Sequence, residues 1–201
     1  MKRLRLKKAE PDDKRLLILR AAIEVFARRG YSNATVNEVA ERAGIASGTV
    51  YLYFHNKVDL FIKSMREVIG NRLTEIKKIV RNEVTAIDKL NRFISQNIQL
   101  FTQSKDAVRF MVVEWRKSED FINLNPGYNP FEEYLDYVEG LCREAVESRA
   151  IRKVNPRTLA FMIVGTMDFV LTQWVSDPDG FDLESMSAEM HGILRHGLVT
   201  Q

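Results

Sequence analysis

The 201-residue sequence is poor in cysteine and proline, and it has no long uncharged apolar run. Its single cysteine, Cys142, excludes an internal disulfide and a zinc site made of cysteines. No stretch approaches the roughly 18–20 uncharged apolar residues of a membrane span. No clean apolar segment follows the basic N-terminus, as a secretory signal requires. These absences predict a cytoplasmic protein without a membrane partner.

Sequence patterns of catalysis and metal binding are also missing. The chain has no Gly-rich phosphate loop, no nucleophile elbow and no paired catalytic carboxylates. His191 and His196 are five residues apart, which does not bring both onto one face of a helix. We therefore expect a protein that is not an enzyme, with no metal site and no cofactor.

The charge of the chain is unevenly distributed. Residues 1–57 hold 12 Lys and Arg against 6 Asp and Glu, a net +6, whereas the other 144 residues hold 18 against 21, a net −3. A basic N-terminal part on a mildly acidic body indicates a polyanion partner for the N-terminal part only. A solvated basic tail, including Arg3, Arg5, Lys7 and Lys8, is the alternative.

Apolar residues recur at spacings of three and four, and alternation at period two is not sustained, so the fold class is predicted to be all-α. The expected helices are Asp13–Arg29, Thr35–Ala43, Ser47–Tyr53, Asn56–Val80, Thr85–Thr102, Lys105–Ser118, Pro130–Ser148, Pro156–Ser176 and Leu183–Leu198. Gly30 is a helix stop, Thr35 and Glu38 form a capping box, and Ser47, Asn56 and Asn155 are N-caps. The long helix from Asn56 links a three-helix head, residues 1–57, to a larger body, residues 58–201.

Two short helices joined by a tight turn at Gly44 predict a helix-turn-helix, whose second helix enters the DNA major groove. Small or hydrogen-bonding residues stand at the start of that helix, and aromatic hydroxyls and cations follow it, as base and phosphate contacts require. The predicted DNA-binding residues are Thr35, Ser47, Gly48, Thr49, Tyr51, Tyr53, His55 and Lys57. Partial burial in the core is the other interpretation of Tyr51 and Tyr53.

The segment Leu17–Phe61 resembles the TetR family of bacterial transcriptional repressors. The residues that carry the resemblance are Ile18-Leu19-Arg20-Ala21-Ala22, Phe26, Gly30-Tyr31, Thr35-Val36, Val39-Ala40, Ala43-Gly44, Gly48-Thr49-Val50-Tyr51, Tyr53-Phe54 and Lys57. Ala34 departs from the family, which often has a second threonine there. The resemblance implies a homodimer on a double-stranded operator, joined through the last two long helices. The residues expected at this interface are Met162, Gly165, Thr166, Phe169, Ile193 and Leu194. Burial in the chain's own core is the alternative for these apolar faces.

Scattered strings in the body, Val113-Glu114-Trp115-Arg116 and Gly165-Thr166-Met167-Asp168, resemble the FadR branch of that family. This implies a repressor of fatty-acid degradation genes, released from DNA by a small-molecule effector, long-chain acyl-CoA. The residues expected to line the effector pocket are Arg109, Phe110, Glu114, Trp115, Arg116, Tyr134 and Asp168. An internal polar network is the structural alternative for the charged ones. A multidrug-type regulator that senses an aromatic or cationic compound is the alternative function.

Overall fold

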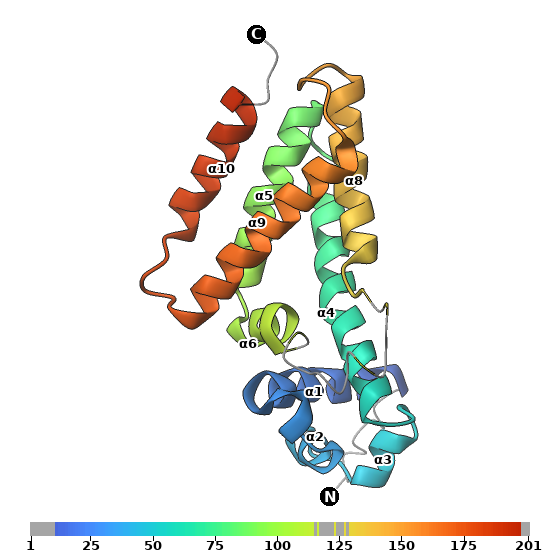
Figure 1. Ribbon diagram of the computed structural model, residues 1–201. Coiled ribbons are helices and arrows are strands. Elements are labelled where there is room, and N and C mark those ends of the chain that lie inside the picture. The colour runs from blue at the N-terminus through green and yellow to red at the C-terminus, as the bar shows by residue number, and fades with distance from the viewer. Residues whose placement is uncertain (1–10, 115, 117–122, 124–126, 128, 198–201) are drawn as a thin grey trace, which may run out of the picture.

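The protein, described here from a computed structural model, has a small helical head below a larger helical body (Figure 1). The structure describes residues 11–114, 116, 123, 127 and 129–197. The head contains α1 (Pro11–Asn33), α2 (Val36–Arg42) and α3 (Ser47–Tyr51). The body contains α4 (Lys57–Val80), α5 (Ala86–Thr102), α6 (Lys105–Arg109), the π-helix η1 (Phe110–Glu114), α8 (Glu132–Glu147), α9 (Pro156–Ser176) and α10 (Leu183–Gly197). All regular elements of the described residues are helices, which confirms the predicted all-α class.

Local hydrogen bonds fix the starts of the helices. The Glu38 N–H donates to the Thr35 hydroxyl at 3.2 Å, and the Thr35 N–H donates to the Glu38 carboxylate at 2.8 Å, which confirms the capping box of α2. The bond from the Thr35 N–H lowers the pKa of Glu38. Asn56 caps α4 and Asn155 caps α9, as predicted. The cap assigned to Ser47 is wrong, because α3 begins after Ala46, which offers no side-chain oxygen.

Gly30 interrupts α1 where the sequence predicts a helix end. Its φ of +74° and ψ of 162° lie in a region essentially restricted to glycine. A Cβ atom at this position would also lie 3.1 Å from a carboxylate oxygen of Glu114 in η1. The backbone conformation of the head therefore favours glycine strongly, and an added Cβ would also require the Glu114 carboxylate to move by a few tenths of an ångström.

Three phenylalanine rings join the head to the body. Phe26 of α1, Phe61 of α4 and Phe110 of η1 are fully buried. The ring centroids lie 5.1 Å apart for Phe26 and Phe61, 5.0 Å for Phe61 and Phe110, and 6.0 Å for Phe26 and Phe110. Tyr31 packs on both Phe26 and Phe61. We call these four residues the junction cluster.

The helix predicted over Lys105–Ser118 changes character after Arg109. Residues Phe110–Glu114 form a π-helix. The Val112 carbonyl, which a continuing α-helix would offer to the Arg116 N–H, accepts a hydrogen bond from the Arg116 guanidinium. Apolar periodicity cannot separate these two helix types, and wide turns of this kind often accompany functional sites.

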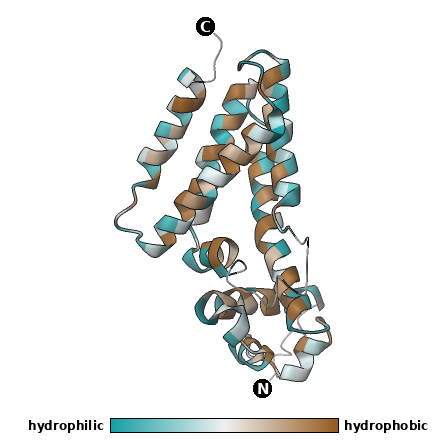
Figure 2. Cartoon of the chain, viewed as in Figure 1, coloured by the Kyte–Doolittle hydropathy of each residue, from teal (hydrophilic) through white to brown (hydrophobic). Residues whose placement is uncertain are grey.

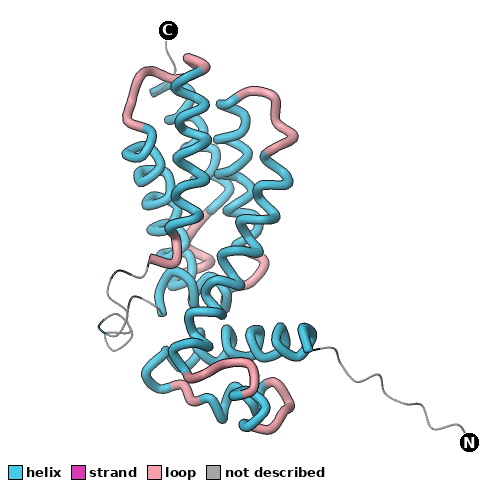
Figure 3. The backbone as a smooth tube through the Cα atoms, turned by 90° about the vertical axis from the view of Figure 1, so that its right-hand side faces the viewer, coloured by secondary structure: helices cyan, strands magenta, loops and turns pink. Residues whose placement is uncertain are grey.

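The long helices of the body lie above the head, and the short α6 lies between them and α1 (Figures 1 and 3). α9 packs on α8 and carries apolar residues along much of its length (Figure 2). Among the described residues it is the one helix long and apolar enough to cross a membrane by length and composition. Its residues Leu159, Ile163 and Val170 are buried in the body, while Phe161 and Met162 are exposed. A helix that is apolar on two faces needs cover on both.

Gly30→Ala should lower the free energy of unfolding by about 1–3 kcal/mol, the cost of a strained backbone, as measured by urea denaturation. Gly70→Ala is the matched control, because Gly70 lies inside α4 and nothing within 4 Å meets an added Cβ. That change should be neutral or stabilising by about 0.5–1 kcal/mol. Equal effects of the two substitutions would contradict the preference for glycine at position 30.

Candidate DNA-binding surface and effector cavity

α3 and the residues after it form the outer end of the head. Val50 and Phe54 are buried and hold this segment on the head's core. Tyr51 is 54% exposed. Gly48 is exposed, whereas Ser47 and Thr49 are half-buried. Tyr53 is half-buried and packs against the core, so its ring has the structural role considered as the alternative and only part of it is accessible.

Thr35, His55 and Lys57 are already engaged inside the head. The Thr35 hydroxyl serves the cap of α2. Lys57 donates to the Ser32 carbonyl at 3.1 Å and lies 4.5 Å from the Tyr31 ring centroid. The His55 N–H donates to the Asp59 carboxylate at 2.9 Å. These bonds hold the loop before α4 and place a cation beside the start of that helix, where phosphates bind readily.

Burial alone would raise the pKa of Asp59, but the Lys63 ammonium and the His55 N–H outweigh it and lower that pKa. Asp59 is therefore ionised at neutral pH and keeps its bond to the His55 backbone. The negative charge in the first turn of α4 also stabilises the helix.

Leu52 belongs to this surface and is absent from the residues predicted from sequence. It follows α3 directly and is 81% exposed, between Tyr51 and Tyr53. An apolar side chain on a DNA-facing surface can contact a thymine methyl group. The apolar periodicity of the sequence does not single out Leu52, because a five-residue helix is too short to define a buried and an exposed face.

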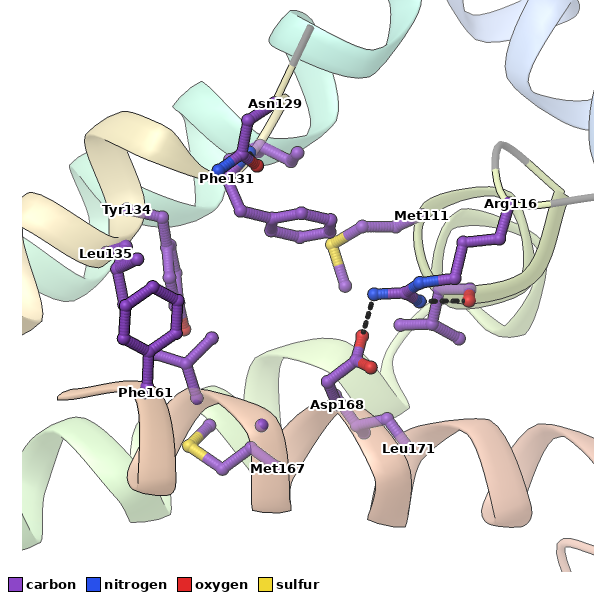
Figure 4. A pocket seen from close by; sticks show the side chains of 14 residues that line it. Met111, Arg116, Asn129, Phe131, Tyr134, Leu135, Phe161, Met167, Asp168 and Leu171 are labelled. Carbon is purple, nitrogen blue, oxygen red and sulfur yellow. Dashed lines mark hydrogen bonds and ion pairs between the residues drawn. The ribbon is translucent and has the colours of Figure 1, made fainter. Parts of the chain in front are cut away.

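A partly open cavity of about 370 Å³ lies between η1, α8, α9 and α4 in the body (Figure 4). Most of its lining is apolar, and includes Ile69, Met111, Val112, Phe131, Leu135, Phe161, Val164, Met167 and Leu171. The polar residues among the lining are Arg116, Asn129, Tyr134 and Asp168. The cavity therefore suits a ligand with a large apolar part and few polar groups.

One end of the cavity carries two opposite charges. The Arg116 guanidinium lies 3.1 Å from the Asp168 carboxylate, and the two side chains point toward each other (Figure 4). Arg116 also donates to the Val112 carbonyl. Burial raises the pKa of Asp168, although Arg116 acts in the opposite direction. The Asp168 side chain is 26% exposed and the Arg116 side chain 42% exposed, so the pair is half-buried and a group that enters the cavity can compete for the arginine.

The opposite end is lined by Tyr134, Leu135 and Phe161 (Figure 4). The Tyr134 hydroxyl donates to the Asn97 side-chain oxygen, and the Asn97 amide donates to the Phe93 carbonyl at 3.0 Å. Burial raises the pKa of Tyr134 well above its ordinary value, so the hydroxyl stays protonated. Because its donor is already used within the protein, this end presents mainly carbon to a ligand.

The structure brings together only three of the residues predicted for the pocket, namely Arg116, Tyr134 and Asp168. Phe110 lies in the junction cluster instead. Arg109 and Glu114 pair with each other at 3.3 Å beside the head and are outside the cavity lining. These three assignments are corrected because consecutive residues of a helix point in different directions. Trp115 lies outside the described residues.

Several cavity residues have no signal in the sequence. Phe131 and Leu135 come from α8 and its start, and Val164, Met167 and Leu171 come from α9. They are aliphatic or aromatic residues in apolar helices. Only the packing of α8 against α9 shows that they line a cavity, because the same residue types also fill a helical core.

The predicted partner-facing residues fall into two groups. Met162, Thr166 and Phe169 are exposed on α9, and Ile193 is exposed on α10. Gly165 is also exposed, but it lines the cavity. Phe169 is 65% exposed although it is a large apolar residue. Leu194, by contrast, is buried in the chain's own core, so its assignment to the interface is corrected.

In the parts of the chain that the structure describes, no group of three or more His, Cys, Asp and Glu side chains is placed to hold a metal ion. Cys142 is buried, and burial raises the pKa of its thiol to about 12, so it is not a thiolate at neutral pH.

Comparison with known proteins agrees with this arrangement. Residues 18–63 match the family "Bacterial regulatory proteins, tetR family", and residues 54–197 match "YsiA-like protein, C-terminal region". The fatty acid metabolism regulator protein of Bacillus subtilis is 31% identical over 187 residues, which cover 92% of this chain and 95% of that protein.

Two solved structures share the fold. The FadR regulator of Bacillus subtilis in complex with stearoyl-CoA has a TM-score of 0.79 and 30% identity, over 90% of this chain and 98% of the other. FadR from Bacillus halodurans has a TM-score of 0.80 and 28% identity, over 94% and 96%. The helix-turn-helix head, the helical body and both family matches together establish that this chain belongs to the TetR family and is a DNA-binding transcriptional regulator, not an enzyme.

Proposed function

We propose that the protein is a repressor which a long-chain acyl-CoA releases from an operator near fatty-acid degradation genes. The observation that carries the proposal is the cavity, which is apolar over most of its lining and has a guanidinium at one end. Such a site matches a ligand with a long hydrocarbon chain and an anionic group. The stearoyl-CoA complex of a regulator with 30% identity supports the same ligand class.

In this proposal the acyl chain lies among Met111, Met167 and Leu171 and ends near Tyr134 and Phe161. Arg116 meets a phosphate of the CoA part, because arginine binds phosphate through two parallel hydrogen bonds. The unbranched methionine side chains adapt to chains of different shape.

The proposed DNA contacts are those of the exposed head. Thr49, Tyr51 and Leu52 face the bases, and Ser47, Gly48, Tyr53, His55 and Lys57 approach phosphates, with Thr35 fixing α2 behind them.

Residues 1–57 form the DNA-binding part and residues 58–201 the ligand-binding part, in the cytoplasm. Two copies joined through the exposed faces of α9 and α10 hold two heads about 34–36 Å apart, one turn of DNA, or at a compatible larger spacing.

A cationic or aromatic effector is the second candidate function. Asp168 favours it, because it is a carboxylate within an apolar cavity and could pair with a cation. The two candidates differ in which partner of the Arg116–Asp168 pair the ligand contacts.

Lys57→Ala should weaken operator binding and reduce the slope of log affinity against log salt by about 0.9, since one phosphate contact is lost. The measurement is fluorescence anisotropy on an operator recovered by selection from random-sequence DNA. Lys153→Ala is the control, because Lys153 is exposed in the loop between α8 and α9, at the far end of the body. An unchanged slope for Lys57→Ala would remove this residue from the phosphate contacts.

Stearoyl-CoA should bind with one molecule per protomer, measured by native mass spectrometry, and should release the operator in the anisotropy assay. A cationic dye such as ethidium should neither bind in the cavity nor compete. Binding of the dye with no binding of stearoyl-CoA would favour the multidrug-type alternative. Release requires that the ligand prefers the state that does not bind DNA, and a 100-fold preference corresponds to about 2.7 kcal/mol.

Phe169→Asp should convert the proposed dimer to monomers in sedimentation velocity, because a charge on an apolar interface is left without water or a partner. It should also weaken operator binding. Val84→Asp is the matched control, since Val84 is a large apolar residue that is 92% exposed in the loop before α5. A dimer that persists in Phe169→Asp would place the interface elsewhere.

A further inference from the structure

The Arg116–Asp168 ion pair spans the polar end of the cavity. Arg116 comes just after η1, and Asp168 lies on α9, 52 positions along the chain. Figure 4 shows their charged groups facing each other beside the apolar lining. The pair is therefore a direct link between η1 and α9, formed inside the site proposed for the effector.

Asp168 is the only carboxylate among the described residues that line this cavity. From α4 the lining residue is Ile69, and from α8 it includes Tyr134, whose hydroxyl is protonated and bonded to Asn97. Within the described part of the cavity lining, Arg116 is thus the charged group that faces Asp168. An anionic group that approaches Arg116 meets Asp168 as a like charge on the same cation.

We infer that Asp168 is an internal competitor for the anionic group of the effector, so that the effector binds by taking Arg116 away from Asp168. This inference rests on the proposed function, since it needs an anionic effector. The ligand contact at Arg116 and the break between η1 and α9 are then one event. A neutral ligand of the same shape would fill the cavity and leave the pair closed.

A consequence of this exchange is proton uptake. Once Arg116 turns to the effector, Asp168 is left in an apolar cavity beside a second negative charge, and both conditions favour its neutral form. Burial already raises the pKa of Asp168 while Arg116 is its partner. The carboxylate therefore binds a proton when the effector binds, and effector affinity increases as pH falls.

The same pair connects the cavity with the head. η1 carries Phe110, which packs on Phe26 and Phe61, and Glu114, which lies against Gly30. While Asp168 holds Arg116, η1 is fixed to α9 and supports one placement of α1. Because the effector breaks this link and releases DNA, the closed pair belongs to the DNA-binding state.

The test compares the full-length wild type with Asp168→Asn, which keeps the shape of the side chain and removes its charge. Stearoyl-CoA binding is measured by titration calorimetry at neutral pH in two buffers of different ionisation enthalpy, which reports proton uptake. The wild type should take up protons on binding. Asp168→Asn should bind about tenfold more tightly and take up none, and its operator affinity without effector should fall severalfold.

Two further variants separate this role from a structural one. Asp168→Glu keeps the carboxylate and should therefore keep proton uptake. It tests the inference independently of whether Asp168→Asn folds. Asp136→Asn removes a carboxylate that pairs with Arg157 between α8 and α9, outside the cavity lining. It should behave as wild type in both measurements.

Unchanged affinity and unchanged proton uptake in Asp168→Asn would overturn the inference. If wild type does not bind stearoyl-CoA, the proposed effector class fails, and operator affinity decides the inference by itself. A severalfold loss in Asp168→Asn, absent in Asp136→Asn, would then support the link between η1 and α9. Equal operator affinities of all three proteins would overturn it.

Discussion

The packing of Phe26, Phe61 and Phe110 joins three parts of the chain that the sequence keeps far apart. Each ring is fully buried, and burial of one such side chain contributes about 1.5–3 kcal/mol. Head and body therefore share a core and are not two bodies on a flexible linker. Any displacement of η1 changes the surface on which α1 rests. The head and η1 also meet closely at Gly30, where an added Cβ would lie 3.1 Å from the Glu114 carboxylate.

η1 consequently joins the cavity to the head, as does α4 through Ile69 and Phe61. Its Met111 and Val112 line the cavity, while Phe110 and Glu114 contact the head. The five residues of this π-helix thus contact both the cavity and the head. Arg116 and Asp168, near the C-terminal end of η1, place two charges in an otherwise apolar site. The site therefore responds to the charge of a ligand as well as to its shape.

The head was predictable from sequence because its determinants are local. Thr35 and Glu38 lie three residues apart, and Gly30 and Asn56 define helix ends by their own chemistry. Ser47 shows the limit of such local signals. Its hydroxyl is a suitable N-cap, but Ser47 is the first residue inside α3 and Ala46 occupies the cap position. The cavity was not predictable in detail because it arises between helices distant in sequence. Ile193 and Leu194 are adjacent, yet one is exposed and the other buried, and helix rotation alone decides this.

α9 has a ligand-facing side and a partner-facing side. Met167, Asp168 and Leu171 line the cavity, and Phe169 points outward between them in sequence. In the proposed dimer, the two cavities are separated from the shared interface by the thickness of one helix each. A ligand that shifts α9 in one protomer alters the surface that the other protomer meets. Effector binding at one cavity of the proposed dimer is then coupled to binding at the other.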